Sequence, residues 1–355
     1  MSDQVLTIHR VALAVTGLVL LGAAGVWARL TPAFVMPLDH SGGLVVRASR
    51  PLMGSDFAVS IWVPASRQAE AQDAAEAALD FVAQLETQIS EWRIDSQISR
   101  LNENAGGEFI WVGKDVAELV TQMRHWAQET NGAFDPTAGR TFELWEQARK
   151  DKTVPHSSQI EAALATAGFQ HLEVKGEYAR LTLPGMRLGT GGIGHGWAAD
   201  RVSAWLSGRG FADHLVDGSG DIAIHGKRGE FPWVLAIRHP RKKTPWVVHA
   251  DSWVGGVSTS GDYERFFEID GRRYSHIIDP RTGWPAEGIA GATVFASTAI
   301  LADVLATAVC VVGTEAGLGL VESIPGVRAV IVRDNGQVVV SKGLRLINSH
   351  LEMVP

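Results

Sequence analysis

The chain has 355 residues, of which 46% are hydrophobic and 20% are charged. This composition excludes a disordered tail and is enough to build one large or two modest domains. The 32 basic and 39 acidic residues leave a net charge of -7, without the basic stripe that a nucleic-acid groove needs. We therefore expect no nucleic acid among the partners.

The N-terminus contains an apolar run without charges at residues 11–28. Such a run is just long enough to span a bilayer, whereas residues 26–28 form a small-residue pattern typical of signal-peptide cleavage. We interpret residues 1–29 as an export signal or an N-terminal membrane anchor. Either one predicts an exported protein, periplasmic or at the outer face of the inner membrane. Pro and Gly residues mark 30–45 as a linker, which leaves 46–355 as the folded domain.

The folded domain is expected to begin with an extended segment at 57–63. Apolar residues then recur at helical spacing, and helices are expected at 66–89, 115–128, 158–167, 196–207, 299–312 and 315–323. Beyond residue 170, short β runs alternate with turns, and Asp270-Gly271 and Asn335-Gly336 are typical of β-hairpins. The fold class is therefore α+β, with largely antiparallel sheets and packed helices.

A glycine loop at residues 189–194 spells G-x-G-x-x-G before a predicted helix. With Asp213 about twenty residues further on, the pattern raises a remote alternative, an NAD-dependent oxidoreductase with a Rossmann unit. The predicted hairpins argue against this alternative, because a Rossmann unit needs a βαβ series. In either fold, a glycine loop that opens a helix presents backbone N–H groups suited to a phosphate.

Asp303 and Thr307 lie four residues apart, on one face of an otherwise apolar predicted helix. Buried polar groups need partners, and a hard cation such as Mg²⁺ would satisfy both oxygens and neutralise a bound pyrophosphate. The structural alternative makes Asp303 a residue of the helix N-terminus and bonds Thr307 to its own backbone. Both interpretations remain open for this pair taken alone.

Two segments before this helix, 257–265 and 274–283, gather hydroxyls, carboxylates, an Arg and a His around Gly and Pro turns. Taken singly, these residues also fit a turn at Asp279-Pro280, a surface pair of Glu264 and Arg265, and a buried His276. Their combination with Asp303 and Thr307 predicts a metal and phosphate site within 257–307.

These motifs, in this order, resemble the ApbE-like FAD:protein FMN transferase family over residues 52–343. The matching segments are 53–55, 92–102, 132–137, 189–200, 217–221, 258–262, 276–283, and Asp303 with Thr307. The resemblance implies an α+β fold with a flavin-binding cleft in which metal-bound FAD is cut at its pyrophosphate. FMN is then joined to a Thr or Ser of another protein, and AMP leaves.

The resemblance also implies roles for individual residues. The FAD site would be lined by Met53, Trp92, Ala133, Phe134, Asp135, Gly189, His195 and His276. The Mg²⁺ ligands would be the backbone carbonyl of Gly192 and the side chains of Asp303 and Thr307. Either His276 or Asp303 would take the proton of the acceptor hydroxyl.

The chain departs from the family pattern at two positions of the glycine loop. The family usually carries an acidic residue where this chain has Gly189, and Lys or another polar residue where it has His195. The loss of a carboxylate at 189 leaves two further functions open: an FAD-binding accessory protein, and an FAD pyrophosphatase that releases free FMN. The main expectation is a Mg-dependent transferase whose partner is an acceptor flavoprotein subunit of a membrane or periplasmic electron-transfer system.

Overall fold

The structure is a computed structural model, and it describes residues 34–35, 42–243, 245–249, 254–263, 266–348 and 350–354. The expected signal or anchor at 1–29, most of the expected linker, and the Glu264–Arg265 pair lie outside these residues. All described residues belong to one structural unit, Pro32–Pro355. Within this described part, no helix combines the length and the apolar character needed to cross a membrane.

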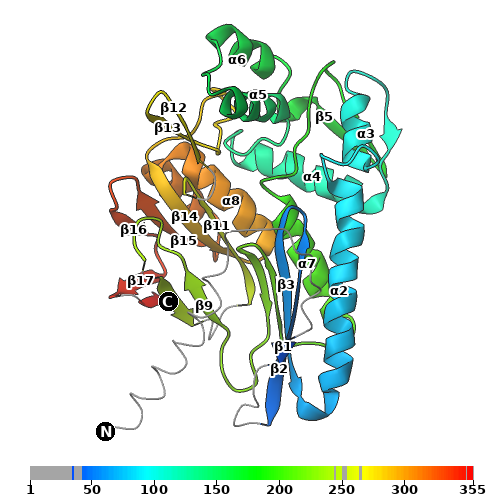
Figure 1. Cartoon of the computed structure of the whole chain (residues 1–355), viewed down its shortest axis with the longest axis vertical. Helices are drawn as coiled ribbons and strands as arrows, with labels where there is room; N and C mark the ends of the chain where they lie inside the picture. The colour runs from blue at the N-terminus through cyan, green and yellow to red at the C-terminus, as the bar shows by residue number, and fades with distance from the viewer. Residues whose placement is uncertain are drawn as a thin grey trace. The chain divides into compact units, whose positions relative to one another are not determined.

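A nine-stranded sheet lies at the centre of this unit (Figure 1). Its strand order is β1-β2-β3-β7-β8-β11-β14-β15-β16. The strands are β1 (Phe34–Val35), β2 (Gly43–Leu52), β3 (Ser55–Pro64), β7 (His214–Gly218), β8 (Asp221–His225), β11 (Gly255–Gly261), β14 (Ile289–Ala296), β15 (Arg328–Arg333) and β16 (Val338–Val340). Every neighbouring pair in this sheet is antiparallel. This pattern confirms the expected fold class and is incompatible with a Rossmann unit, which requires parallel strands.

One face of the sheet is covered by helices that Figure 1 shows side by side: α2 (Gln68–Ile89), α7 (Gly194–Ser207) and α8 (Ala299–Val312). The helix α9 (Thr314–Ser323) follows α8 and packs beside it and against β15. The α8 helix starts where the side chain of Thr298 accepts a hydrogen bond from the amide of Leu301, and it ends before Gly313. Most of its residues are buried, because it packs on the sheet and against both neighbouring helices.

The opposite face of the sheet packs against a second, four-stranded sheet of order β17-β18-β10-β9. Its strands are β9 (Val234–Ile237), β10 (Trp246–His249), β17 (Leu344–Ile347) and β18 (His350–Met353). Trp233, Leu235 and Trp246 from this layer share a core cluster with Val257 and Phe295 of the large sheet. The described unit therefore has three layers: helices, large sheet and small sheet.

Short elements gather at one end of the large sheet, at the top of Figure 1. They are α3 (Gln97–Glu103), β4 (Ile110–Trp111), α4 (Lys114–Glu129), α5 (Gly139–Asp151), α6 (Ser157–Leu164), β5 (Leu172–Lys175), β6 (Tyr178–Leu181), β12 (Phe266–Ile269) and β13 (Arg272–Ser275). Short 3-10 turns lie at Ala65–Arg67 and Phe169–His171. The ring of Trp145 in α5 packs at a tilt against Phe267 and Tyr274, and its Nε1 donates a hydrogen bond to the carbonyl of Gly283 at 2.7 Å. These contacts fix the segment that follows β13.

The six expected helices and both expected hairpins are confirmed within one to three residues of their predicted ends. In the β12–β13 turn, Asp270 and Gly271 both have positive φ, as a tight two-residue hairpin requires. The helices α3 and α5 were not expected, because they are short or rich in charged residues. The expected domain start at 46 falls inside β2. The strand β2 begins at Gly43, and Leu44 and Val45 are already buried.

Candidate functional site

The glycine loop, residues 189–194, is the point where several distant segments meet. The amide of Gly189 donates to the carbonyl of Pro136 at 2.8 Å, which places residues 133–137 beside the loop. A Cβ placed on Gly192 would lie 3.4 Å from the Phe134 ring and 3.7 Å from Thr307 Oγ1. One residue predicted to bind FAD and two predicted metal ligands are therefore neighbours in the folded chain.

Asp303 reaches the same place because α7, which follows the glycine loop, crosses α8 very closely. The amide of Gly196 donates to Asp303 Oδ2 at 3.2 Å across 107 residues of sequence. A Cβ on Gly196 would lie 2.6 Å from the carbonyl oxygen of Ala299, so this crossing requires a glycine. Asp303 is 4% exposed and lies one helical turn before Thr307. The crossing thus brings Gly192, Asp303 and Thr307 together.

The hydroxyl of Thr307 faces β11 of the large sheet. Thr307 Oγ1 and Ser260 Oγ are hydrogen-bonded at 3.1 Å. Further along the same strand, Ser258 Oγ donates to Asp221 Oδ1 at 2.5 Å. Hydroxyls from β11 therefore connect the α8 residues to the carboxylate of Asp221 at the start of β8. This position differs from the structural alternative, in which Thr307 was bonded to its own backbone.

Buried carboxylates dominate the electrostatics of this region. Burial, followed by the charge of Asp221, raises the pKa of Asp303 well above its usual range, while the hydrogen bond from Gly196 opposes the rise. Burial likewise raises the pKa of Asp221, opposed by its bond from Ser258. Among the described residues, no Lys or Arg forms an ion pair with either carboxylate. Two buried carboxylates without a cationic partner favour a bound cation.

The chemistry of the donor set fits a hard cation. A carboxylate, a hydroxyl and a backbone carbonyl are oxygen donors of the kind that Mg²⁺ prefers. The set contains one carboxylate only, and in the part of the chain that the structure describes no three His, Cys, Asp or Glu side chains are placed to share a metal ion. Asp303, Thr307 and the carbonyl of Gly192 could therefore hold Mg²⁺ together with oxygens of a phosphate.

The first hairpin supplies Met53 and contacts His195, the next two predicted residues. Met53 occupies the turn between β2 and β3, and its Cε lies 3.6 Å from the position of a Cβ on Gly194. His195 Nε2 and Ser55 Oγ are hydrogen-bonded at 3.0 Å. Met53 and His195 therefore lie at the same end of the glycine loop, where α7 begins.

The remaining predicted FAD residues lie in different environments. Ala133 and Phe134 are buried. Asp135 Oδ1 accepts bonds from the amide and hydroxyl of Thr137 at 2.9 and 2.6 Å, and Oδ2 accepts from the amide of Phe169 at 3.1 Å. Burial raises the pKa of Asp135, and these bonds oppose the rise. Its carboxylate thus fixes the loop 133–137. Trp92, in contrast, is 80% exposed in the turn after α2, available to a planar ligand.

His276 directly follows β13 and is half-buried. Its neighbour Ile277 belongs to the same core cluster as Leu301 and Leu305, so the segment 276–283 is packed onto α8. A cavity of about 320 Å³ runs beside this segment and is lined by Arg272, Tyr274, Asp279, Thr282, Trp284, Pro285, Ala286, Glu287 and Val311. The cavity offers space next to the predicted catalytic segment, and none of the predicted FAD or metal residues lines it.

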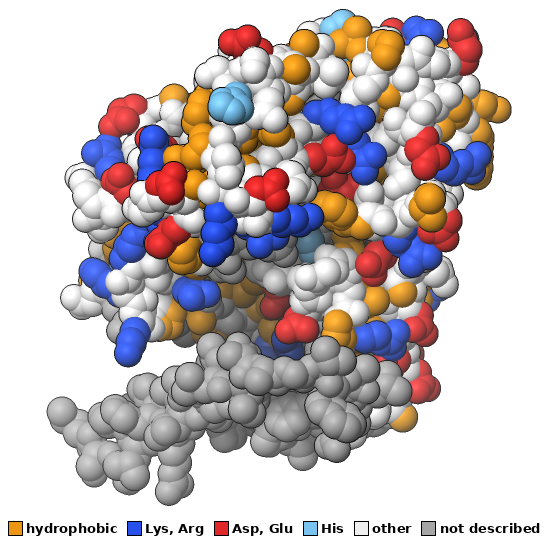
Figure 2. Space-filling model, turned by 45° about the horizontal axis from the view of Figure 1, so that its top comes forward, with side chains coloured by type: hydrophobic (Ala, Val, Ile, Leu, Met, Phe, Trp, Pro, Cys, Tyr) orange, Lys and Arg blue, Asp and Glu red, His pale blue; other side chains and the backbone are white. Residues whose placement is uncertain are grey.

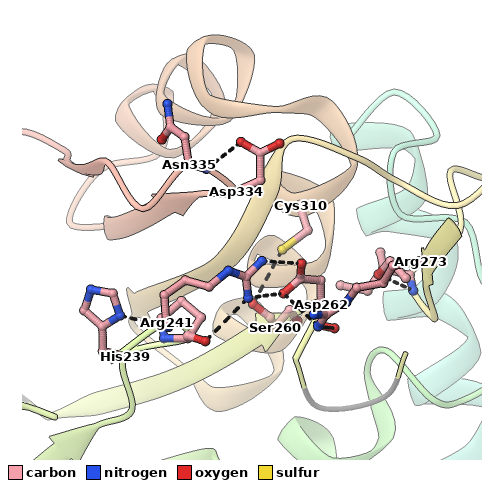
Figure 3. A network of polar contacts seen from close by, with 11 residues as sticks. His239, Arg241, Ser260, Asp262, Arg273, Cys310, Asp334 and Asn335 are labelled. Carbon is pink, nitrogen blue, oxygen red and sulfur yellow. Dashed lines mark hydrogen bonds and ion pairs between the residues drawn. The ribbon is translucent and has the colours of Figure 1, made fainter. Parts of the chain in front are cut away.

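Asp262, part of the Ser-Thr-Ser-Gly-Asp segment, lies in an ion-pair network (Figure 3). Arg241 donates to both carboxylate oxygens of Asp262 at 2.9 and 2.6 Å, and Arg273 donates to its backbone oxygen at 2.8 Å. The buried thiol of Cys310 lies beside it and donates to the carbonyl of Ser260 at 3.5 Å. Sequence reasoning missed Arg241 and Arg273, because their partner lies 21 and 11 residues away. Asp262 thus holds the end of β11 in place.

The expectation that the glycine loop presents free amides is wrong for most of the loop. Gly189 donates to Pro136, Ile193 and Gly194 donate to the carbonyl of Thr190, and Thr190 donates to Glu91 Oε1 at 3.0 Å. A tight turn satisfies its own amides, which a G-x-G-x-x-G pattern does not reveal. Glu91, a carboxylate outside every pattern recognised in the sequence, is thereby part of this site.

On the face shown in Figure 2, Lys and Arg side chains are interspersed with Asp and Glu. Many of the described cations are engaged in ion pairs, such as Arg50 with Glu76 and Asp80. This face therefore carries no basic stripe of the kind that binds a phosphate backbone.

Known proteins share this sequence and this fold. Residues 53–331 match the model of the ApbE family. The chain is 33% identical to the FAD:protein FMN transferase of Vibrio cholerae over 259 residues, which are 70% of this chain and 76% of that protein. It is 34% identical to the FAD:protein FMN transferase of Escherichia coli K12 over 273 residues, 74% of this chain and 77% of that protein.

Solved structures agree with these sequence matches. The ApbE protein of Thermotoga maritima superposes with a TM-score of 0.75 at 30% identity, covering 84% of this chain and 97% of that one. The flavinyl transferase ApbE of Pseudomonas stutzeri, in its apo form, superposes with a TM-score of 0.73 at 32% identity, covering 88% and 96%. The family model spans the glycine loop and α8, and this chain belongs to the ApbE family.

Proposed function

We propose that the chain is an FAD:protein FMN transferase that uses Mg²⁺ and joins FMN to a Thr or Ser of an acceptor protein. The observation that carries the proposal is the meeting of Gly192, Asp303 and Thr307 beside Phe134. Phosphoryl transfer depends on positioning and charge neutralisation more than on covalent chemistry by the enzyme. A buried oxygen-donor set next to an aromatic residue fits that requirement for a flavin pyrophosphate.

The reaction breaks the phosphoanhydride bond of FAD and forms a phosphoester bond to the acceptor. The hydroxyl oxygen of the acceptor bonds to the phosphorus on the FMN side of FAD, and the bond from that phosphorus to the bridging oxygen breaks. AMP leaves with the bridging oxygen, and the hydroxyl proton passes to His276 or Asp303. Mg²⁺, when bound, neutralises charge on the pyrophosphate. The chain itself orients the substrate, with Met53 and Phe134 beside the glycine loop and Trp92 offering a ring face.

A single incubation separates this function from the two alternatives. Purified full-length protein is mixed with FAD, Mg²⁺ and a candidate acceptor subunit, and the products are followed by mass spectrometry. A covalent flavin on the acceptor with one AMP per flavin supports the transferase, and an acceptor with its Thr changed to Val is the control. Free FMN with AMP indicates a pyrophosphatase. Bound FAD without AMP indicates an accessory protein, and either outcome rejects the transferase.

We also propose an exported location and a partner in an electron-transfer system. The support is the apolar run at residues 11–28, which is typical of an export signal or a membrane anchor. The acceptor would then be a flavoprotein subunit of a membrane or periplasmic complex. A fusion of residues 1–45 to a reporter that is active only outside the cytoplasm tests this location. A reporter that stays inactive in the fusion rejects it.

A further inference from the structure

Glu91 occupies space that a side chain at position 189 would fill. A Cβ placed on Gly189 would lie 3.2 Å from Glu91 Oε2 and 3.6 Å from Glu91 Oε1. The backbone of Gly189 lies outside the left-handed region, so its conformation alone would allow a side chain. It is therefore the carboxylate of Glu91, in the turn after α2, that crowds a side chain here.

Glu91 is held firmly in this position. Its Oε1 accepts the amide of Thr190 at 3.0 Å, and its backbone carbonyl accepts the hydroxyl of Ser99 at 3.3 Å. Burial raises the pKa of Glu91, and the amides of Thr190 and Gly191 together with Arg187 oppose the rise. Arg187 itself pairs with Glu143 at 2.7 Å. Glu91 is thus half-buried, and its carboxylate is held mainly by loop amides.

The surroundings of Glu91 are those of the proposed FAD site. The next residue, Trp92, is 80% exposed, and Ile89, two residues before Glu91, lies with Met53 beside Gly194 at the start of α7. A carboxylate has about four acceptor positions, so the two loop amides leave capacity on Glu91. The flavin dinucleotide offers hydroxyl groups and an amino group as donors.

We propose that Glu91 supplies the ligand-binding carboxylate of the glycine loop, accepting a hydrogen bond from a hydroxyl or amino group of FAD. The inference rests on the proposed function, because it takes FAD as the ligand. In this chain the carboxylate enters the site from the turn after α2, and Gly189 provides the room for it. A carboxylate on residue 189 in place of Glu91 would reach nearly the same point, since its Cβ position lies within 3.6 Å of both Glu91 oxygens.

The experiment measures FAD affinity of the full-length protein by flavin fluorescence, with EDTA and with Mg²⁺, and the unfolding temperature of each variant. Glu91→Gln, which keeps the shape and one acceptor oxygen, should weaken FAD binding about tenfold or more in both conditions. Gly189→Asp alone should also weaken binding, because two carboxylates then compete for one space. Glu91→Ala combined with Gly189→Asp should restore affinity to within about threefold of the wild type. Glu103→Gln, an exposed carboxylate at the end of α3, is the matched control.

The outcomes are separable. Unchanged FAD affinity in Glu91→Gln overturns the inference, and so does a double variant that binds as weakly as Glu91→Ala. A loss that appears only with Mg²⁺ means that Glu91 acts through the carbonyl of Gly192, which also overturns a direct contact. A wild-type protein that binds no FAD in either condition overturns the proposed function, and the inference with it.

Discussion

The amide of Gly196 donates a hydrogen bond to Asp303 Oδ2 at 3.2 Å and so joins the helix of the glycine loop to α8. The bond holds one oxygen of the carboxylate and leaves the other for a ligand. This bond requires α7 and α8 to lie close together.

Asp303→Ala should abolish metal-dependent AMP release. Loss of the charged ligand removes several kcal/mol of charge neutralisation, so turnover should fall by more than about a hundredfold. The metal-free variant should remain folded, because the change removes a buried carboxylate whose pKa is raised by burial. Magnesium titrations of AMP release and thermal unfolding check both parts. Wild-type turnover in this variant would remove Asp303 from the metal site.

Thr307→Val and Thr307→Ser separate the hydroxyl from the shape of residue 307. The Val variant loses the hydroxyl that contacts Ser260 and should bind Mg²⁺ about tenfold more weakly or worse. The Ser variant keeps the hydroxyl and should stay within about threefold of the wild type. The readout is the Mg²⁺ concentration that gives half-maximal AMP release. Equal values for both variants would mean that the hydroxyl is not a ligand.

Gly196→Ala should destabilise the fold. The new Cβ would lie 2.6 Å from the Ala299 carbonyl oxygen and 2.9 Å from Asp303 Cβ, so α7 and α8 would have to separate. The expected cost is about 1–3 kcal/mol in the free energy of unfolding, measured by denaturant titration. Gly319→Ala is the control. It lies in α9 with no atom near its Cβ position, and it should stabilise the protein by about 0.5–1 kcal/mol.

Asp200 should make the stability of the metal-free protein depend on pH. Its carboxylate accepts the amides of Ala299 and Ile300 at 2.9 Å each, yet burial raises its pKa to about 6, with those bonds opposing. Because the folded pKa exceeds the unfolded value, Asp200 binds protons more tightly in the folded state. Its contribution to stability is therefore complete below about pH 4 and is lost as the pH rises through about 6.

The matched variant for this effect is Asp200→Asn, which cannot titrate. The compared quantity is the free energy of unfolding of the wild type minus that of Asp200→Asn. This difference should be about 1–2 kcal/mol larger at pH 4.5 than at pH 7. Denaturant titrations at the two pH values, with EDTA present, give this difference directly. A difference that stays constant with pH, or grows as the pH rises, would contradict the raised pKa.

The fold class, the main helices and the hairpins could be predicted from the sequence, because these depend on local periodicity and turn chemistry. Apolar spacing in 66–89 and 299–312 is enough to predict a helix. Asp270-Gly271 predicts its turn, because few residues adopt positive φ at both positions. Asp303 and Thr307 could also be paired in advance, since four residues in a helix make one turn. Short or highly charged helices such as α3 and α5 lacked such a signal.

Which of these residues meet could be seen only in the folded chain. No local pattern shows that the amide of Gly196 reaches Asp303 across 107 residues, or that Thr190 reaches Glu91 across 99. Both contacts depend on how closely helices pack, which is set by the size of side chains on both partners. Compared with the family pattern, the sequence at Gly189 shows only that a carboxylate is missing. In the folded chain it is the space that the carboxylate of Glu91 fills.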